Sequence, residues 1–460
     1  MSDVKMAQQE NKMGVMPVNQ LLVNMSLPMM ISMLVQALYN IIDSIFVAKV
    51  GEEALTAVSL AFPIQTLLIA FGAGTGVGVN ALLSKCLGEK DFEKANKTAM
   101  NGIFLAFLNY VLFVVIGFLA VKPFYLSQVK TTESDIYTMG ISYLSIVCIC
   151  SFGIYGQFIF ERLLQATGKT FLSMLSQLAG AVTNIILDPI LIFGMFGLPK
   201  LGVAGAAIAT VIGQCVGAAI AITFNLKKNH EIHISFKGFK PDGQIIGKIY
   251  TVGVPSIIMQ AIGSVMTYGM NLILIQFTAT ATAVFGVYFK LQSFFFMPVI
   301  GLNNGMIPII AYNYGAGKRS RMVKTIKLSM LYAFMLMFLG FLAFMLIPEQ
   351  LFGLFSASEE MLAIAVPALR IIGIHFLIAW FCIISSAVFQ AVGNGVYCLI
   401  VSCARQLIVL LPAAYILAKL GGLHMVWWSF PIAEIMSFAV SLTFLILTWK
   451  KVISKVPDNV

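Results

Sequence analysis

Twelve long apolar stretches, separated by short polar segments, constrain what this chain can fold into. Hydrophobic residues make up 59% of its 460 residues, and charged residues only 10%. A run of about 20 apolar residues is long enough to cross a bilayer as an α-helix. We therefore predict an all-α polytopic membrane protein with spans near residues 17–47, 55–84, 98–121, 136–159, 170–196, 202–226, 245–277, 282–312, 325–347, 360–387, 395–418 and 424–449.

Positive charge is distributed unevenly between the two sides of these spans. If the spans alternate in direction, 21 lysine and arginine residues fall on the side of the chain ends and 5 on the other side. Cytoplasmic segments of membrane proteins carry such an excess. We therefore expect both termini in the cytoplasm. The net charge of +10 follows from this bias and needs no nucleic-acid partner.

The second half of the chain repeats the first. One constant offset in residue number pairs Pro28 with Pro255, Ala54 with Ala281, Phe62 with Phe289, Gln65 with Gln292, Gly74 with Gly301, Gly78 with Gly305, Gly88 with Gly315 and Lys97 with Lys324. A second, slightly smaller offset pairs Gln165-Ala166-x-Gly168 with Gln390-Ala391-x-Gly393. Six spans in each half give both halves the same orientation, and transporters built this way bind substrate between their repeats. We expect a first lobe at 1–226, a cytoplasmic loop at 227–244 and a second lobe at 245–460, related by a pseudo-twofold axis.

Two spans of the first half carry carboxylates at membrane depth. Asn184 and Asp188 lie four residues apart in the fifth span, so a helix puts them on one face. Asp43 lies at a similar depth near the outer end of the first span. An ionisable residue inside a membrane is costly and marks a functional site by default. The structural alternatives are that Asp188 caps a helix break at Pro189, and that Asp43 bonds to neighbouring backbone. The equivalent positions of the second half hold Met270, Val409 and Ala413.

Several sequence strings resemble the multidrug and toxic compound extrusion (MATE) family over the whole chain. They are Leu38-Tyr39-Asn40-Ile41-Ile42-Asp43, Leu87-Gly88-Glu89-Lys90-Asp91, the Gln-Ala-x-Gly motif at 165–168, the run Asn184 to Gly194, and Gly202-Val203-Ala204-Gly205-Ala206-Ala207. The segment from Asn184 to Gly205 looks most similar to the MepA-like bacterial subgroup.

The resemblance implies two six-helix lobes, a bacterial plasma membrane and export of drugs and organic cations in exchange for H⁺ or Na⁺. It places the coupling site on Asp43, Asn184 and Asp188, with Thr210 as a further ligand. It implies no cofactor, and no metal beyond Na⁺ at these residues. We expect a functional monomer and substrate contacts at Gln65, Gln292, Phe296 and Met297.

Other polar residues in or near the spans receive structural interpretations. We expect Glu161 and Arg162 to be interfacial, because they stand at the cytoplasmic end of a span, and Glu434 to make a structural hydrogen bond. Lys290, Arg370 and Arg405 are expected to snorkel or to face water or partners.

Two other classes of function are compared with drug export. An intramembrane enzyme needs a nucleophile, a base or a metal cluster, and the spans contain no motif for one. A lipid-linked oligosaccharide flippase shares the general architecture. It would favour a cavity lined with cations for pyrophosphate, for which only Lys290, Arg370 and Arg405 are available. Neutralising these three residues would separate the two functions.

Overall fold

The computed structural model describes residues 10–129, 131–355 and 358–458, and in these ranges every named element is helical. The first half contains α1 (Lys12–Val15), α2 (Val18–Ala48), α3 (Glu52–Gly88), α4 (Phe92–Leu119), α5 (Val121–Val129), α6 (Asp135–Ile149), α7 (Phe152–Ala166), α8 (Thr170–Phe193), the 3₁₀ turn η1 (Met195–Gly197) and α9 (Val203–Lys228). The second half contains α10 (Gly243–Leu274), α11 (Ala279–Gly315), α12 (Arg319–Leu346), α13 (Pro348–Gly353), α14 (Glu359–Gly373), α15 (Phe376–Ala391), α16 (Gly395–Cys403), the π-helix η2 (Ala404–Leu410), α17 (Leu411–Val426), α18 (Ser429–Lys451) and η3 (Ile453–Lys455).

The described helices confirm the predicted fold class. Ten are each long and apolar enough to cross a membrane, and two bent pairs raise the number to twelve if each pair is one span. The pairs are α6 with α7, bent by 43°, and α14 with α15, bent by 52°. The predicted boundary between the last two spans, at residues 418 to 424, coincides with a break inside α17, where Gly421 and Gly422 leave the helical conformation.

The backbone repeats itself as closely as the sequence does. Gly168 and Gly393, which are equivalent in the two halves, both have φ of +84°. The turn after α3 places Lys90 at φ +59°, and the matching turn after α11 places Gly317 at φ +67°. In both turns the following residue donates its N–H back across five residues, Asp91 to Cys86 and Lys318 to Asn313. The sequence duplication is therefore also a duplication of local structure.

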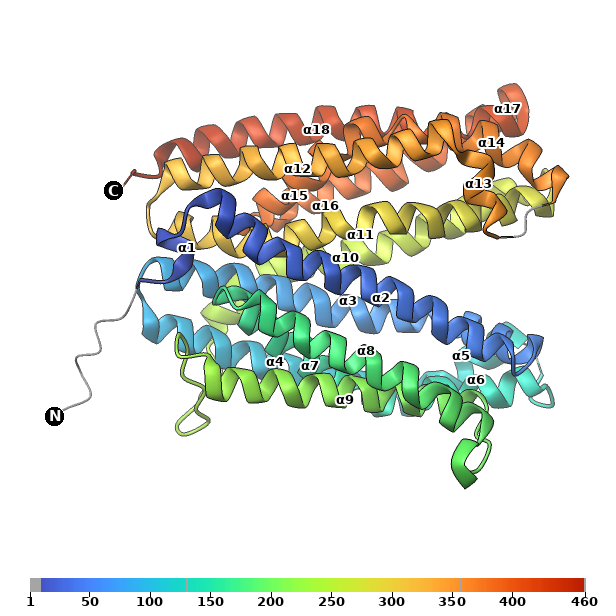
Figure 1. Ribbon diagram of the computed structural model, residues 1–460, viewed down its shortest axis with the longest axis horizontal. Helices are drawn as coiled ribbons and strands as arrows, with labels where there is room; N and C mark the ends of the chain where they lie inside the picture. Colours follow the sequence, from blue (N-terminus) through green and yellow to red (C-terminus); the bar gives the residue numbers. More distant parts are fainter. Residues whose placement is uncertain (1–9, 130, 356–357, 459–460) are drawn as a thin grey trace.

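Helices α2 and α3 of the first half pack against α10 and α11 of the second (Figure 1). A methyl group added at Gly88 would overlap the backbone carbonyl of Tyr312, and one added at Gly315 would overlap that of Lys85. Lys85 and Tyr312 are themselves equivalent positions of the two halves, so the two contacts are reciprocal. Small residues allow this close approach of helix backbones in a membrane.

The same pattern recurs one step further along the interface. A methyl group at Gly74 would lie 2.5 Å from Ile257, and one at Gly301 would lie 2.5 Å from the backbone of Met30. Both glycines stand in the second part of their helices, which run toward the end of the molecule that carries the described chain ends (Figure 1). At that end Lys318 pairs with Glu10 at 2.9 Å and forms a backbone bridge with Asp458. The two halves are therefore joined tightly on the side of the chain ends.

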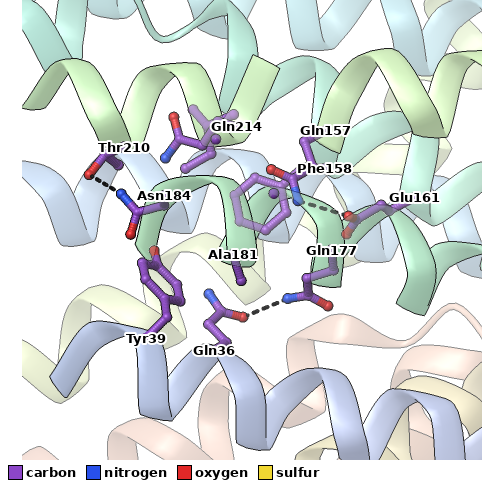
Figure 2. A pocket seen from close by; sticks show the side chains of 13 residues that line it. Gln36, Tyr39, Gln157, Phe158, Glu161, Gln177, Ala181, Asn184, Thr210 and Gln214 are labelled. Atoms are coloured by element: carbon purple, nitrogen blue, oxygen red, sulfur yellow. Dashed lines mark hydrogen bonds between the residues drawn. The ribbon is translucent and has the colours of Figure 1, made fainter. Parts of the chain in front are cut away.

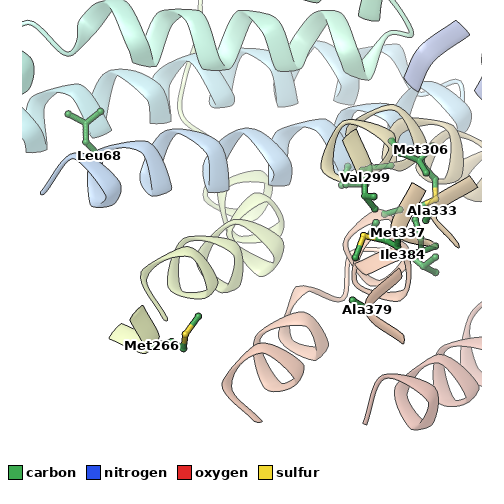
Figure 3. Packing of buried hydrophobic residues seen from close by; sticks show 14 of the residues in the cluster. Leu68, Met266, Val299, Met306, Ala333, Met337, Ala379 and Ile384 are labelled. Carbon is green, nitrogen blue, oxygen red and sulfur yellow. The ribbon is translucent and has the colours of Figure 1, made fainter. Parts of the chain in front are cut away.

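The interior of the second half is apolar where α11, α12 and α15 meet. Val299 and Met306 of α11 and Met337 of α12 gather with side chains of α15, including Ile384 (Figure 3). All four side chains are buried. Such a core holds these helices together largely by packing, whereas the site described next lies in the first half.

Candidate functional site

Asp43 and Asp188 approach each other from two helices that end on the same side. Asp43 stands five residues before the end of α2, and Asp188 five residues before the end of α8. Helix α8 packs against α2 and α9. The equal depth expected from the sequence is therefore present, and the two carboxyl groups lie within hydrogen-bonding reach of each other.

Asn184 connects Asp188 to α9. Its side-chain amide lies 3.4 Å from Asp188 Oδ1 and 3.3 Å from Thr210 Oγ1. Asp188 is fully buried, and Asn184 is 3% exposed. The helices come this close because Gly180 and Gly213 face each other. A methyl group at Gly213 would lie 2.7 Å from the Gly180 carbonyl oxygen. All four residues of the predicted coupling site thus lie together.

One oxygen atom of this site lacks a donor. Asp43 Oδ1 is buried and receives no hydrogen bond from a donor group in the described part of the chain. Two ionised carboxylates are both acceptors, so a direct hydrogen bond between Asp43 and Asp188 requires a proton on one of them. An unpaired charge in a low-dielectric setting is costly. The geometry is therefore that of a buried acidic pair whose charge is not compensated by a donor among the described residues.

Two tyrosines and a glutamine surround the acidic pair. Tyr39 lies one helical turn before Asp43 and interacts electrostatically with both carboxylates, and Tyr143 interacts with Asp43. Gln65 Nε2 donates to the Tyr143 hydroxyl at 2.8 Å. Gln65 is expected from the sequence to line the substrate cavity, and the structure places it beside the acidic pair.

A cavity of about 60 Å³ begins at Asn184 and Thr210 and continues between α2, α7, α8 and α9 (Figure 2). It is lined by Gln36, Tyr39, Ile154, Gln157, Phe158, Glu161, Gln177, Gly180, Ala181, Asn184, Thr210, Gly213 and Gln214. About 10–15 Å³ of such space accommodates one water molecule, so this cavity holds a few waters and no drug-sized molecule.

Three residues predicted to contact substrate lie in α11, away from this cavity. Phe296 stacks on His375 with ring centroids 5.9 Å apart and meets Phe376 edge-on at 5.3 Å. Gln292, Phe296 and Met297 are all half-buried. Their expected contact with substrate stays a prediction.

The sequence interpretation of Glu161 and Arg162 was wrong. Both are buried, at 6% and 9% exposure, because α7 continues past them into the packed interior. Arg162 Nη1 donates to Gln165 at 2.9 Å and to Asn304 of the second half at 3.0 Å. The signal that sequence reasoning overlooked is Gly76, since a methyl group there would lie 2.7 Å from Arg162 Cγ.

The second half contains an ion pair with one buried partner instead of an acidic pair. Arg405, in the π-helix η2, lies 3.3 Å from Glu434 of α18, and Glu434 is 2% exposed. The structural role expected for Glu434 thus takes the form of an ion pair. Lys290 and Arg370 are exposed. Of the three cations considered for a pyrophosphate site, two are therefore exposed and the third is paired with Glu434.

Comparison with known proteins agrees with this architecture. The MatE family model matches twice, at residues 28–190 and 255–416, once in each half. The multidrug export protein MepA of Staphylococcus aureus is 28% identical over 421 residues, covering 91% of each chain. MepA of Staphylococcus haemolyticus is 29% identical over 416 residues, covering 90% of each chain.

Solved structures show the same fold along nearly the entire chain. A multidrug resistance MATE family transporter of the MOP superfamily, described in an outward-facing conformation, superposes with a TM-score of 0.91 at 26% identity, covering 98% of this chain and 99% of its own. A MOP superfamily transporter from Pyrococcus furiosus superposes with a TM-score of 0.90 at 26% identity and the same coverage.

The fold and the comparisons together define a multi-span membrane transporter built from two related bundles. The chain belongs to the MatE family.

Proposed function

We propose that this protein is a cation-coupled antiporter that exports drugs and organic cations across the bacterial plasma membrane by alternating access. The observation that carries the coupling is the contact between Asp43 and Asp188, with its buried oxygen that lacks a donor. The substrate class is supported by the similarity to the multidrug export protein MepA.

The acidic pair couples an ion to the shape of the first half through electrostatics. With both carboxylates charged, repulsion and desolvation favour their separation, which moves α2 away from α8. One H⁺ or Na⁺ between them removes that repulsion and favours the approach seen here. Pro28 in α2 and Pro189 in α8 interrupt the helical hydrogen bonds and provide places for bending.

Alternating access requires that the two halves part on one side and close on the other. In this conformation the reciprocal glycine contacts close the side of the chain ends. Ion binding and release would bias the choice between this arrangement and its opposite. A bias of about 5.5 kcal/mol converts a 1:99 population into 99:1, and a smaller bias shifts it less.

The substrate would bind between the halves. The first-half cavity is too small for it in this conformation. Helix α11 borders the first half and carries Gln292, Phe296 and Met297, which are half-buried and offer an amide, a ring and a thioether. Flexible and aromatic side chains suit a site that accepts varied apolar cations.

The test is transport by the purified protein in liposomes. An organic cation such as ethidium is loaded, and its export is followed under a pure proton gradient and then under a pure sodium gradient. We expect one gradient to drive export. Asp188→Asn should abolish the driven export, whereas Glu52→Gln, an exposed carboxylate at the start of α3, should leave it unchanged. Export that neither gradient accelerates would contradict the proposal.

A further inference from the structure

Glu161 is a buried carboxylate that the coupling site does not include. It belongs to α7, lines the cavity between α2, α7, α8 and α9, and is 6% exposed. Its Oε1 accepts hydrogen bonds from Gln157 Nε2 at 2.9 Å and from Ser176 Oγ at 3.1 Å (Figure 2 shows the bond from Gln157). It is the one carboxylate among the residues that line this cavity.

No cation neutralises Glu161 directly. Arg162 is its neighbour in sequence, but the Arg162 guanidinium donates to Gln165 and Asn304 instead. No ion pair within 4.0 Å involves Glu161 in the described ranges 10–129, 131–355 and 358–458. A buried carboxylate without a cation is costly when charged and inexpensive when protonated. In this position Glu161 is therefore suited to accept a proton.

The cavity offers the route for that delivery. At one end stand Thr210 and Asn184, whose amide lies 3.4 Å from Asp188 Oδ1, and at the other end stands Glu161 (Figure 2). The walls between them present amides and hydroxyls from Gln36, Tyr39, Gln177 and Gln214. These groups donate and accept hydrogen bonds and can order the few water molecules that the volume accommodates.

The groups around Glu161 are mostly uncharged. Arg162, on the same helix, is the charged group that acts on it. Toward the cavity, α2, α8 and α9 present neutral groups, of which Tyr39 is titratable. Helices α3 and α4 pack against α7 at Gly72, Gly76 and Gly102. Helix α11 contacts α7 through Asn304, which accepts a hydrogen bond from Arg162.

We propose that Glu161 is a second protonation site, which receives the coupling proton from Asp188 through water in this cavity and passes it toward the side of the chain ends. In this step the Asp188 O–H bond breaks and its proton goes to a water beside Asn184, each further water along the cavity accepts one proton and donates another, and an O–H bond forms on Glu161. No electrons are transferred. The inference rests on the proposed function with H⁺ as the coupling ion.

The primary test is the variant Glu161→Gln, read by infrared difference spectroscopy between low and high pH. The amide introduced at this position keeps an oxygen that accepts from both Gln157 and Ser176, so the variant removes the titration and preserves the bonds. We expect the protonated-carboxyl band of the wild type to lose one component in Glu161→Gln and a different component in Asp188→Asn. Export driven by protons should slow by about a hundredfold or more, in line with what a positioned acid–base group contributes.

A second pair of variants keeps the test informative if Glu161→Gln fails to fold. Ala181 faces the cavity between its two ends (Figure 2). Ala181→Leu should fill the passage and slow proton exchange at Glu161, whereas Ala181→Ser should leave the passage open and the exchange unchanged.

The infrared measurement needs no transport, so it stays valid if drug export is disproved. An unchanged carboxyl band and an unchanged pH profile of export in Glu161→Gln would overturn the proposal. Equal rates of proton exchange at Glu161 in Ala181→Leu and Ala181→Ser would also overturn the proposal.

Discussion

At the level of single residues, the proposed coupling depends on how a few polar groups meet in an apolar bundle. Asp188 is held by one amide, and that amide belongs to Asn184, which also reaches Thr210 on the next helix. Asp43 has no comparable donor among the described residues. The two acids are therefore unequal. Asp188 is fixed in place by its neighbours, and Asp43 is free to move with α2.

Asn184→Ala should weaken coupled export without abolishing it. The substitution removes the contacts to Asp188 and Thr210 and leaves both carboxylates in place. A hydrogen bond of this kind contributes about 1 kcal/mol, which corresponds to about fivefold in rate or affinity. Export assays at several gradient sizes measure the effect. A loss as complete as that of Asp188→Asn would show that Asn184 is itself an essential ion ligand.

Lys90→Gly should stabilise the protein. Lys90 has φ of +59°, a left-handed conformation that disfavours side chains, and the matching turn of the second half uses Gly317. Relief of this conformation is worth about 1 kcal/mol. Thermal unfolding in detergent should show a higher midpoint for Lys90→Gly and a lower one for Gly317→Ala. A lower midpoint for Lys90→Gly would mean that contacts of the lysine side chain outweigh the backbone cost.

At the level of helices, the glycines of α3 and α11 determine how closely the halves approach. Gly88 and Gly315 meet backbone atoms that cannot move aside independently of their helices. Gly286, in the same helix α11, has open space around it. The interface therefore depends on particular small residues and not on glycine content in general.

Gly88→Ala and Gly315→Ala should each loosen the closed side. Overpacking of this kind typically costs about 1–3 kcal/mol. Each variant should make a cysteine placed at Ser26, which is buried at the interface beside Gly305, react faster with a thiol reagent. Gly286→Ala is the matched control and should react at the wild-type rate. Equal reactivity in all four proteins would show that these glycines do not hold this side closed.

At the level of the whole molecule, most of the fold could be predicted from the sequence. The spans followed from their length and hydropathy, and the duplication followed from two constant offsets between the halves. The acidic pair was also predictable, because Asp43 and Asp188 lie at similar distances from the ends of their spans. The division into lobes at 226 and 245 stays a prediction.

Other features were hidden from sequence reasoning for physical reasons. The burial of Glu161 depends on where the glycines of α3 allow α7 to lie. Arg405 of the Arg405–Glu434 pair stands in a π-helix, which the sequence does not indicate. The cavity arises from four helices at once, so no single stretch of sequence indicates it.

The predicted orientation in the membrane is tested by labelling. Single cysteines at Lys200, between α8 and α9, and at Lys237, between α9 and α10, are both exposed and lie on opposite sides of the bilayer if α9 spans it. An impermeant reagent added to intact cells should label position 200 and spare position 237. The reverse pattern would place the termini outside the cytoplasm.

Ion movement driven by the substrate in liposomes gives the sharpest test of the coupling by the acidic pair. A downhill gradient of an organic cation is imposed without any ion gradient, and the appearance of H⁺ or Na⁺ movement in the opposite direction is recorded. The wild type should build up an ion gradient at the expense of the substrate gradient. In Asp43→Asn protein the acidic pair cannot exchange its ion, so the substrate should still cross downhill while ion movement stops. Asp43→Asn protein that moves ions at the wild-type rate would contradict this mechanism and make Asp43 a structural residue.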